Sequence, residues 1–298
     1  MSRIHEFIKT HDYACWCGQR VARVFCRQMF VGRRFVALEC NDCRTQRILP
    51  NALHDQSSAE VLYNEYNGPD FSEVDIEQFT KNILKRLRET RVSFGPGKKV
   101  LDVGCGNGVL LETICKQFGC IGTGIDVDQR RIANARARAK HASFRCELFD
   151  GAKLGEKYDV IISSAVIEHV VDPPGFLKQF HPALADDGSL FLLTPNAGSL
   201  NYRLLRSWWR ELLSIGEHIY LFTPGSLESC AGRAGFELIK LSSDFDWASP
   251  KFRANGFRNL LISLWAAYRE WVKRFSSRLA SPQTGDILYA HFRKARAV

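Results

Sequence analysis

A glycine-rich loop follows an apolar run at residues 98–103. Gly104, Gly106 and Gly108 stand in this loop, and a helical pattern begins at Val109. Glycines at a strand-to-helix junction permit a tight turn and let a ligand approach backbone N–H groups closely. The G-x-G-x-G spacing lacks the further glycine, at position 109, that grips a dinucleotide pyrophosphate. The loop therefore predicts a ligand site and disfavours a dinucleotide.

An acidic residue ends the next predicted strand. Asp126 closes the run CIGTGID and lies 22 residues after Gly104. In doubly wound folds an acid at this position accepts hydrogen bonds from ribose hydroxyls. The loop and this acid together indicate a ligand that contains ribose.

A glutamate and a histidine stand side by side after another predicted strand. The run YDVIISS, residues 158–164, reads as a buried strand, and Glu168 and His169 follow it. Ligands bind at the carboxyl edge of open α/β sheets, where this pair is expected. Histidine titrates near neutrality, so His169 suits the role of general base for a hydroxyl group. The alternative is structural: Glu168 caps a helix and His169 packs against a bound cofactor.

Four cysteines near the N-terminus have metal-ligand spacing. Cys15 and Cys17 form one pair, and Cys40 and Cys43 form a second. Two such pairs commonly hold a tetrahedral zinc ion, which is structural when protein fills all four positions. The first pair is C-x-C instead of C-x-x-C, so ordinary buried cysteines are the alternative. Cys26 could replace either Cys15 or Cys17.

The elements that must position these residues alternate along the chain. From residue 98 to 196, short apolar runs take turns with helical stretches, which predicts βαβ units and a parallel sheet covered on both faces. Residues 75–90 predict an amphipathic helix before it. Two late strand candidates, at 236–243 and 285–294, predict an antiparallel edge.

The run VLDVGCGNG followed by GIDVD resembles motif I and the ribose acid of class I methyltransferases that use S-adenosyl-L-methionine (SAM). The resemblance covers about residues 98–196 and implies an α/β, Rossmann-like fold with a mostly parallel seven-stranded sheet and an antiparallel last strand. The segment SAVIEHVVDP resembles ubiquinone-biosynthesis O-methyltransferases. The early cysteines with LYNEYNG at 62–68 resemble the zinc-ribbon-like segment of bacterial methyltransferases from sugar and polysaccharide gene clusters.

The crowding of five cysteines into the first 43 residues predicts a separate cysteine-rich module at 1–50, a candidate for zinc binding. A helical connector at 51–97 and a SAM-dependent methyltransferase domain at 98–298 are expected to follow it. The resemblance also implies cofactor-binding roles. Asp102 and the loop face the methionine moiety, Asp126 the ribose hydroxyls, and Val127 the adenine. Many relatives carry Gly-Asp at the end of the next strand, where this chain has Glu-Leu. The full set of cofactor-binding candidates is Asp102, Gly104, Cys105, Gly106, Gly108, Asp126, Val127, Glu147 and Leu148.

His218 is a further catalytic candidate. Relatives place a histidine before the L-F-T-P turn, over the acceptor pocket, and His218 precedes that turn here. An ordinary loop histidine is the alternative. Some relatives also carry a glutamate three residues before the Glu-His pair, consistent with a metal site. Ala165 occupies that place, so metal-assisted catalysis is disfavoured.

Two segments mix tryptophan, leucine and arginine, at 201–216 and 257–275. They belong to insertions expected at about 198–222 and 246–283. The second follows a helical stripe, which suits either a lid over the active site or peripheral contact with an anionic membrane. Large apolar walls at an acceptor pocket suit a lipid-linked, isoprenoid or glycolipid acceptor.

Charge and composition narrow the function classes. Lys and Arg number 41 against 32 Asp and Glu, so the formal charge of +9 favours an anionic partner. The sequence shows no secretory signal pattern and no membrane-spanning run, so we expect a cytoplasmic protein. If residues 257–275 bind lipid, we expect the protein to lie at the inner face of the membrane. The leading hypothesis is methyl transfer from SAM to a hydroxyl of a small-molecule, sugar or lipid-linked acceptor. The alternatives are an RNA base methyltransferase and a non-catalytic SAM-binding protein. The segment SAVIEH disfavours the RNA enzyme, because the segment lacks the Asn/Asp-Pro-Pro-aromatic signature of amine methylation.

Overall fold

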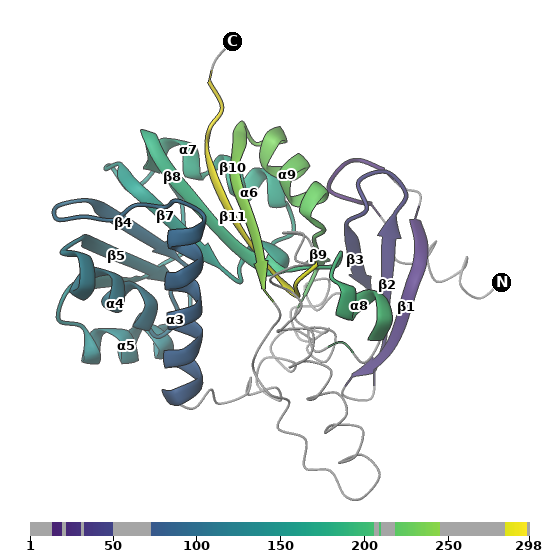
Figure 1. Ribbon diagram of the computed structural model, residues 1–298, viewed down its shortest axis with the longest axis horizontal. Helices are drawn as coiled ribbons and strands as arrows, with labels where there is room; N and C mark the ends of the chain where they lie inside the picture. Colours follow the sequence, from purple (N-terminus) through teal and green to yellow (C-terminus); the bar gives the residue numbers. More distant parts are fainter. Residues whose placement is uncertain are drawn as a thin grey trace, which may run out of the picture.

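The computed structural model describes residues 14–19, 22–30, 33–49, 73–205, 209, 218–244 and 284–296. A small sheet lies at one end of the molecule, beside a larger sheet flanked by helices (Figure 1). Three predicted features fall outside these ranges: the 62–68 stretch, most of 201–216, and 257–275. Within the described ranges, no helix is both long and apolar enough to span a bilayer.

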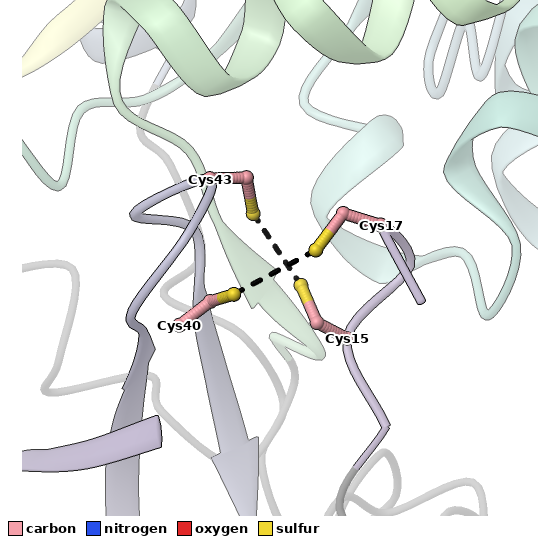
Figure 2. A group of neighbouring side chains, drawn as sticks. All are labelled: Cys15, Cys17, Cys40 and Cys43. Carbon is pink, nitrogen blue, oxygen red and sulfur yellow. Dashed lines mark hydrogen bonds between the residues drawn. The ribbon is translucent and has the colours of Figure 1, made fainter. Parts of the chain in front are cut away.

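The small sheet is built mainly from the cysteine-rich part of the chain. Its strands, in spatial order, are β1 (Ala22–Phe30), β2 (Arg33–Cys40), β3 (Gln46–Leu49) and β9 (Tyr220–Leu221). All three pairings are antiparallel. The turns at 15–18 and 40–43 bring four sulfur atoms toward one another beside it (Figure 2). Because β9 comes far later in the chain, this sheet joins the N-terminal module to the larger domain.

The larger sheet has seven strands in the order β10-β11-β8-β7-β4-β5-β6. Their bounds are β4 (Lys99–Val103), β5 (Ile121–Asp126), β6 (Ala142–Cys146), β7 (Tyr158–Ser164), β8 (Leu184–Pro195), β10 (Phe236–Asp244) and β11 (Ile287–Lys294). β11 runs antiparallel to β10 and β8, and the remaining pairings in this sheet are parallel. The mostly parallel sheet with an antiparallel last strand is therefore confirmed, as is the late antiparallel pair.

Helices cover both faces of this sheet. On one face lie α3 (Glu73–Glu89), α4 (Val109–Phe118) and α5 (Gln129–Arg138); on the other lie α6 (Pro173–Lys178), α7 (Phe180–Ala183) and α9 (Pro224–Arg233). The helix predicted at 75–90 is thus confirmed as α3. The alternation of strands with helices has produced the three layers that βαβ units require.

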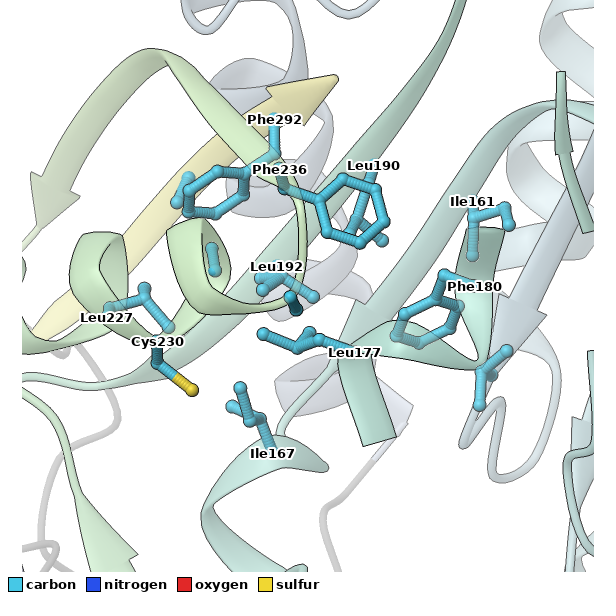
Figure 3. Packing of buried hydrophobic residues seen from close by; sticks show 14 of the residues in the cluster. Ile161, Ile167, Leu177, Phe180, Leu190, Leu192, Leu227, Cys230, Phe236 and Phe292 are labelled. Atoms are coloured by element: carbon cyan, nitrogen blue, oxygen red, sulfur yellow. The ribbon is translucent and has the colours of Figure 1, made fainter. Parts of the chain in front are cut away.

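The strand sequences explain how one sheet holds two cores. Successive side chains on a strand point to opposite faces, so a run of apolar residues serves both. On β8, Leu190 and Leu192 pack under α6, α7 and α9, as Figure 3 shows, whereas Phe191 and Leu193 pack under the helices of the opposite face. On β4, Leu101 packs on the face of α6, α7 and α9, and Val100 packs on the opposite face. Both faces of the sheet are therefore packed against helices, and its carboxyl edge carries the loops.

Candidate functional site

The glycine loop is held at the carboxyl edge of β4 by backbone geometry that only glycine fits. Gly104 and Gly108 have φ angles of 78° and 74°, in the left-handed region. A Cβ on Gly104 would lie 2.3 Å from Val166 Cγ2, and one on Gly108 would lie 2.5 Å from the Phe144 ring. The loop therefore packs directly against the segment that leads to Glu168.

Asp126 fastens this loop from the end of β5. Its Oδ2 accepts a hydrogen bond from the Gly106 N–H at 2.8 Å, and its Oδ1 accepts one from the Asp128 N–H at 2.9 Å. Asp128 in turn caps α5 by accepting from Arg130 N and Arg131 N. A carboxylate has about four acceptor positions, so two remain for ribose hydroxyls. Asp126 therefore lies at the end of β5 and orders the loop, and its ribose contact stays a prediction.

Three buried polar atoms beside the loop fit a polar ligand. Asp102 Oδ1, Asn107 Oδ1 and Ser163 Oγ have no hydrogen-bond partner among the described residues. Buried polar atoms are normally paired, so unpaired ones at this edge of the sheet indicate a binding partner. Asp102 is fully buried, and burial together with the charge of Asp126 raises its pKa to about 7. Ionised Asp102 complements a cationic group such as the ammonium of the methionine moiety of SAM.

Asn107 and Ser163 were not among the sequence candidates. Asn107 lies inside the predicted loop, and Ser163 lies opposite Val103 where β7 and β4 end together. The available signal was position alone: both are small polar residues at the carboxyl edge of the sheet.

The predicted adenine side has two exposed apolar side chains. Val127 follows β5 and is 67% exposed, and Leu148 follows β6 and is 81% exposed. The two strand ends lie side by side, because Glu147 N–H donates to Asp126 O at 3.1 Å. Exposed Val and Leu at adjacent strand ends fit the flat faces of a base. Cys105 is buried in the loop, so its contribution is packing.

Glu168, His169 and His218 come together from two segments. Glu168 and His169 belong to the short helix η2 (Ile167–His169), which follows β7, and His218 stands just before β9. A carboxylate oxygen of Glu168 and one imidazole nitrogen from each histidine all lie within 4.8 Å of one another. The two imidazole centroids are 5.0 Å apart. The structure thus unites all three predicted catalytic residues.

The environment of this trio suits proton transfer. Glu168 is 1% exposed and accepts a hydrogen bond from Thr194 Oγ1 at 3.0 Å. Burial raises the pKa of Glu168, while the charge on His169 opposes that rise. Three such groups can pass or share a proton, and their spacing would also accommodate a cation. Ala165, which offers no ligand, has a φ of 55°, and this left-handed residue turns the chain from β7 toward η2.

The four N-terminal cysteines have the geometry of a tetrahedral metal site. Cys15 Sγ lies 3.5 Å from Cys43 Sγ, and Cys17 Sγ lies 3.6 Å from Cys40 Sγ, with all four sulfurs within 4.8 Å of one another (Figure 2). Zinc–sulfur bonds of about 2.3 Å in a tetrahedron put the sulfurs about 3.8 Å apart. The donor set and spacing therefore fit zinc.

The protonation of these cysteines also favours a cation. The pKa of Cys43 is lowered to about 5, chiefly by its hydrogen bond with the Cys15 thiol. That same contact, together with burial, raises the pKa of Cys15. The thiolate is the metal-binding form, so the lowered pKa of Cys43 favours metal binding. Cys26 lies outside this group, on β1, where it packs with Phe35.

Comparisons with known proteins agree with this site. Residues 75–241 match the methyltransferase domain family. The chain is 30% identical over 156 residues to the ubiquinone biosynthesis O-methyltransferase of Azorhizobium caulinodans, covering 49% of this chain and 61% of that enzyme. It is 32% identical over 182 residues to the enzyme of the same name from Pelagibacter ubique, covering 57% of this chain and 75% of that enzyme. This chain thus spans less than two thirds of the length of the first relative.

A solved structure shares the fold. The methyltransferase in a complex with the Trm112 methyltransferase activator of Haloferax volcanii superposes with a TM-score of 0.51 at 18% identity, covering 74% of this chain and 94% of that one. The glycine loop, the ribose acid, the seven-stranded sheet and the family match agree, and the chain belongs to the methyltransferase domain family as a SAM-dependent class I methyltransferase.

Proposed function

We propose that the protein transfers the methyl group of SAM to a hydroxyl of a small-molecule, sugar or lipid-linked acceptor. The observation that carries the proposal is the meeting of buried Glu168 and His218 with half-buried His169 beside the glycine loop. A hydroxyl must lose its proton during methylation, and a histidine titrating near neutrality is a suitable acceptor for it. The relatives described above, whose names specify O-methyl transfer, support the same choice.

The residues of the chain divide the work of the reaction. SAM supplies an electrophilic methyl group on a sulfonium. The loop and Asp126 fix the cofactor site, because Asp126 ties Gly106 to the end of β5. Displacement at a methyl carbon needs alignment and exclusion of water more than chemical assistance. The trio provides the remaining requirement, which is a place for the acceptor proton.

Within the trio, His169 is the proposed proton acceptor and Glu168 its partner. Glu168 is held by Thr194 and buried, so its charge is felt strongly by the neighbouring imidazoles. A negative Glu168 stabilises the imidazolium that forms when His169 takes a proton. His218, 6% exposed, closes the site from the other segment.

The acceptor class is tested by following the methyl group. Full-length protein is incubated with methyl-labelled SAM and an extract of its own cells, which is then separated into lipid, glycan, small-molecule and RNA fractions. We expect label in a lipid, glycan or small-molecule fraction, on oxygen. Label in RNA, or on nitrogen, would contradict the proposal.

A variant pair then tests the proton acceptor. His169→Gln should lower turnover by about 10²- to 10⁴-fold while the SAM dissociation constant stays within about twofold. The matched control is His141→Gln, because the His141 side chain is 42% exposed and pairs with Glu112 in the first turn of α4, outside the trio. Equal turnover in the two variants would remove His169 from the reaction.

A further inference from the structure

We infer that strand β3 of the cysteine module is a positioning element of the methyl-transfer site: a metal ion in the four-cysteine cluster fixes β3, and β3 holds His218 against Glu168 and His169. The inference rests on the proposed function for its chemical meaning. It assigns to the N-terminal module a role on the acceptor side of the reaction, separate from SAM binding.

The first link joins the cluster to Thr45, the residue before β3. Thr45 is completely buried. Its Oγ1 accepts a hydrogen bond from Trp16 Nε1 at 2.9 Å and lies 3.2 Å from Cys43 Sγ in a second hydrogen bond. Its carbonyl accepts from Cys40 N–H at 2.9 Å. One residue thus contacts both cysteine turns, so ordering the cluster orders the start of β3.

The second link joins β3 to His218. Gln46 pairs with Leu221 and Arg47 with Tyr220, and the Ile48 N–H donates to Ile219 O at 2.9 Å. β3 therefore runs alongside the chain that emerges from His218. A two-residue strand such as β9 has little stability of its own and depends on the strand beside it.

The third link joins the same segment to the other half of the trio. The Ile219 N–H donates to Glu168 O at 2.8 Å, while Ile219 O accepts from Ile48. The peptide groups of Ile219 are thus shared between η2 on one side and the cysteine module on the other. His218 is the next residue, and its ring reaches His169 at a centroid distance of 5.0 Å. If β3 moves, the backbone that aims His218 moves with it.

A separate contact ties the cluster to the helix after β9. Arg233 on α9 donates from Nη1 to Cys17 O at 3.1 Å, and its guanidinium lies 5.4 Å from the centre of the Trp16 ring. α9 begins directly after β9, at a capping box between Thr223 and Ser226. The C-terminal end of the helix that follows β9 is therefore attached to the first cysteine turn.

The cofactor site is built from a different sheet. Among the described strands, β3 pairs with β2 and β9 and with none of the seven strands that carry the glycine loop and Asp126. The core beneath α3, α4 and α5, which includes Cys105 of the loop, contains no described residue of the cysteine module, whereas the opposite core shares Ile219, Tyr220 and Phe222 with the β9 segment. Loss of the metal should therefore disturb His218 and leave SAM binding intact, which a general loss of stability would not do.

The test measures the accessibility of His218 and needs no acceptor. Full-length protein is compared in three forms: metal-loaded, metal-depleted with a chelator, and Ile48→Pro with metal. The proline removes the N–H that donates to Ile219 and leaves the four sulfurs in place. Ile48→Val, which keeps that N–H, is the matched control. For each form we measure zinc content, the SAM dissociation constant by calorimetry, and the rate at which diethyl pyrocarbonate modifies His218, relative to exposed His141.

We expect the relative rate of His218 modification to rise about tenfold in the metal-depleted protein and in Ile48→Pro. The SAM affinity of both forms should stay within about twofold of that of the metal-loaded protein. Ile48→Val should match the metal-loaded protein in both measurements. An unaltered His218 rate in either form, or wild-type protein that binds no metal, would overturn the inference. So would a parallel loss of SAM binding, because the effect would then not be confined to the acceptor side. A metal-loaded protein that fails to bind SAM would instead refute the proposed function.

Discussion

Asp102 should make SAM binding depend on pH. Its pKa is raised to about 7 because the carboxyl is buried at the end of β4, with the charge of Asp126 as a second cause. If ionised Asp102 faces the ammonium group of SAM, binding below pH 7 must first remove a proton from Asp102. At pH 6 about one tenth of the sites are ionised, so SAM affinity should be about tenfold weaker than at pH 8, or about 1.4 kcal/mol.

The same shift has a consequence for stability. A carboxyl whose pKa is higher in the folded than in the unfolded protein destabilises the fold once it ionises. The free energy of unfolding without SAM should therefore fall as pH rises from about 4 to about 7, by about 4 kcal/mol from this group alone, and then level off. Asp102→Asn should remove this dependence.

Calorimetry in two buffers of different ionisation enthalpy measures both the affinity and the proton release. Wild-type protein should release close to one proton per SAM at pH 6 and almost none at pH 8. Asp102→Asn should bind SAM more weakly at every pH but without the tenfold change, and Asp186→Asn, altered at an 83% exposed side chain, should behave as wild type. A wild-type dissociation constant that is equal at pH 6 and pH 8 would refute the reasoning.

Two further predictions concern the loop and the cysteines. Gly108→Ala should lower the free energy of unfolding by about 2–4 kcal/mol, because the new Cβ would meet the Phe144 ring and the φ angle is 74°. Gly106→Ala has open space around it and should lower the same free energy by about 1 kcal/mol. Equal losses for the two variants in chemical denaturation would contradict the steric argument. Wild-type protein should contain about one zinc ion per chain, and Cys40→Ser should lose it with a lower melting temperature, whereas exposed Cys146→Ser should keep it. Metal analysis that finds no zinc in the wild type would refute the site.

The cofactor side of the site was predictable because its signals are local. The loop, Asp126 and the strand ends are each defined by a few consecutive residues, and the periodicity of the strands placed them at one edge of a sheet. Asn107 and Ser163 escaped notice for a physical reason. A polar residue at a strand end is common, and only its burial without a partner sets it apart.

The acceptor side was predictable only in pieces. Glu168 and His169 were candidates, and His218 was another, but nothing in the sequence showed that they meet. Their meeting depends on β9, whose two residues are too few to show a strand period, and on its pairing with β3 more than 170 positions earlier. Pairings between distant segments leave no local pattern, so the link between the cysteines and His218 required the structure.

The most direct measurement of the central claim is calorimetric titration of SAM into wild-type protein and into Asp126→Ala. Asp126 both holds the Gly106 and Asp128 N–H groups and offers its remaining lone pairs to the ribose. The account predicts that wild-type protein binds one SAM per chain and that Asp126→Ala binds it at least about tenfold more weakly. Equal affinity in the two proteins would contradict the assignment of this loop and acid as the cofactor site.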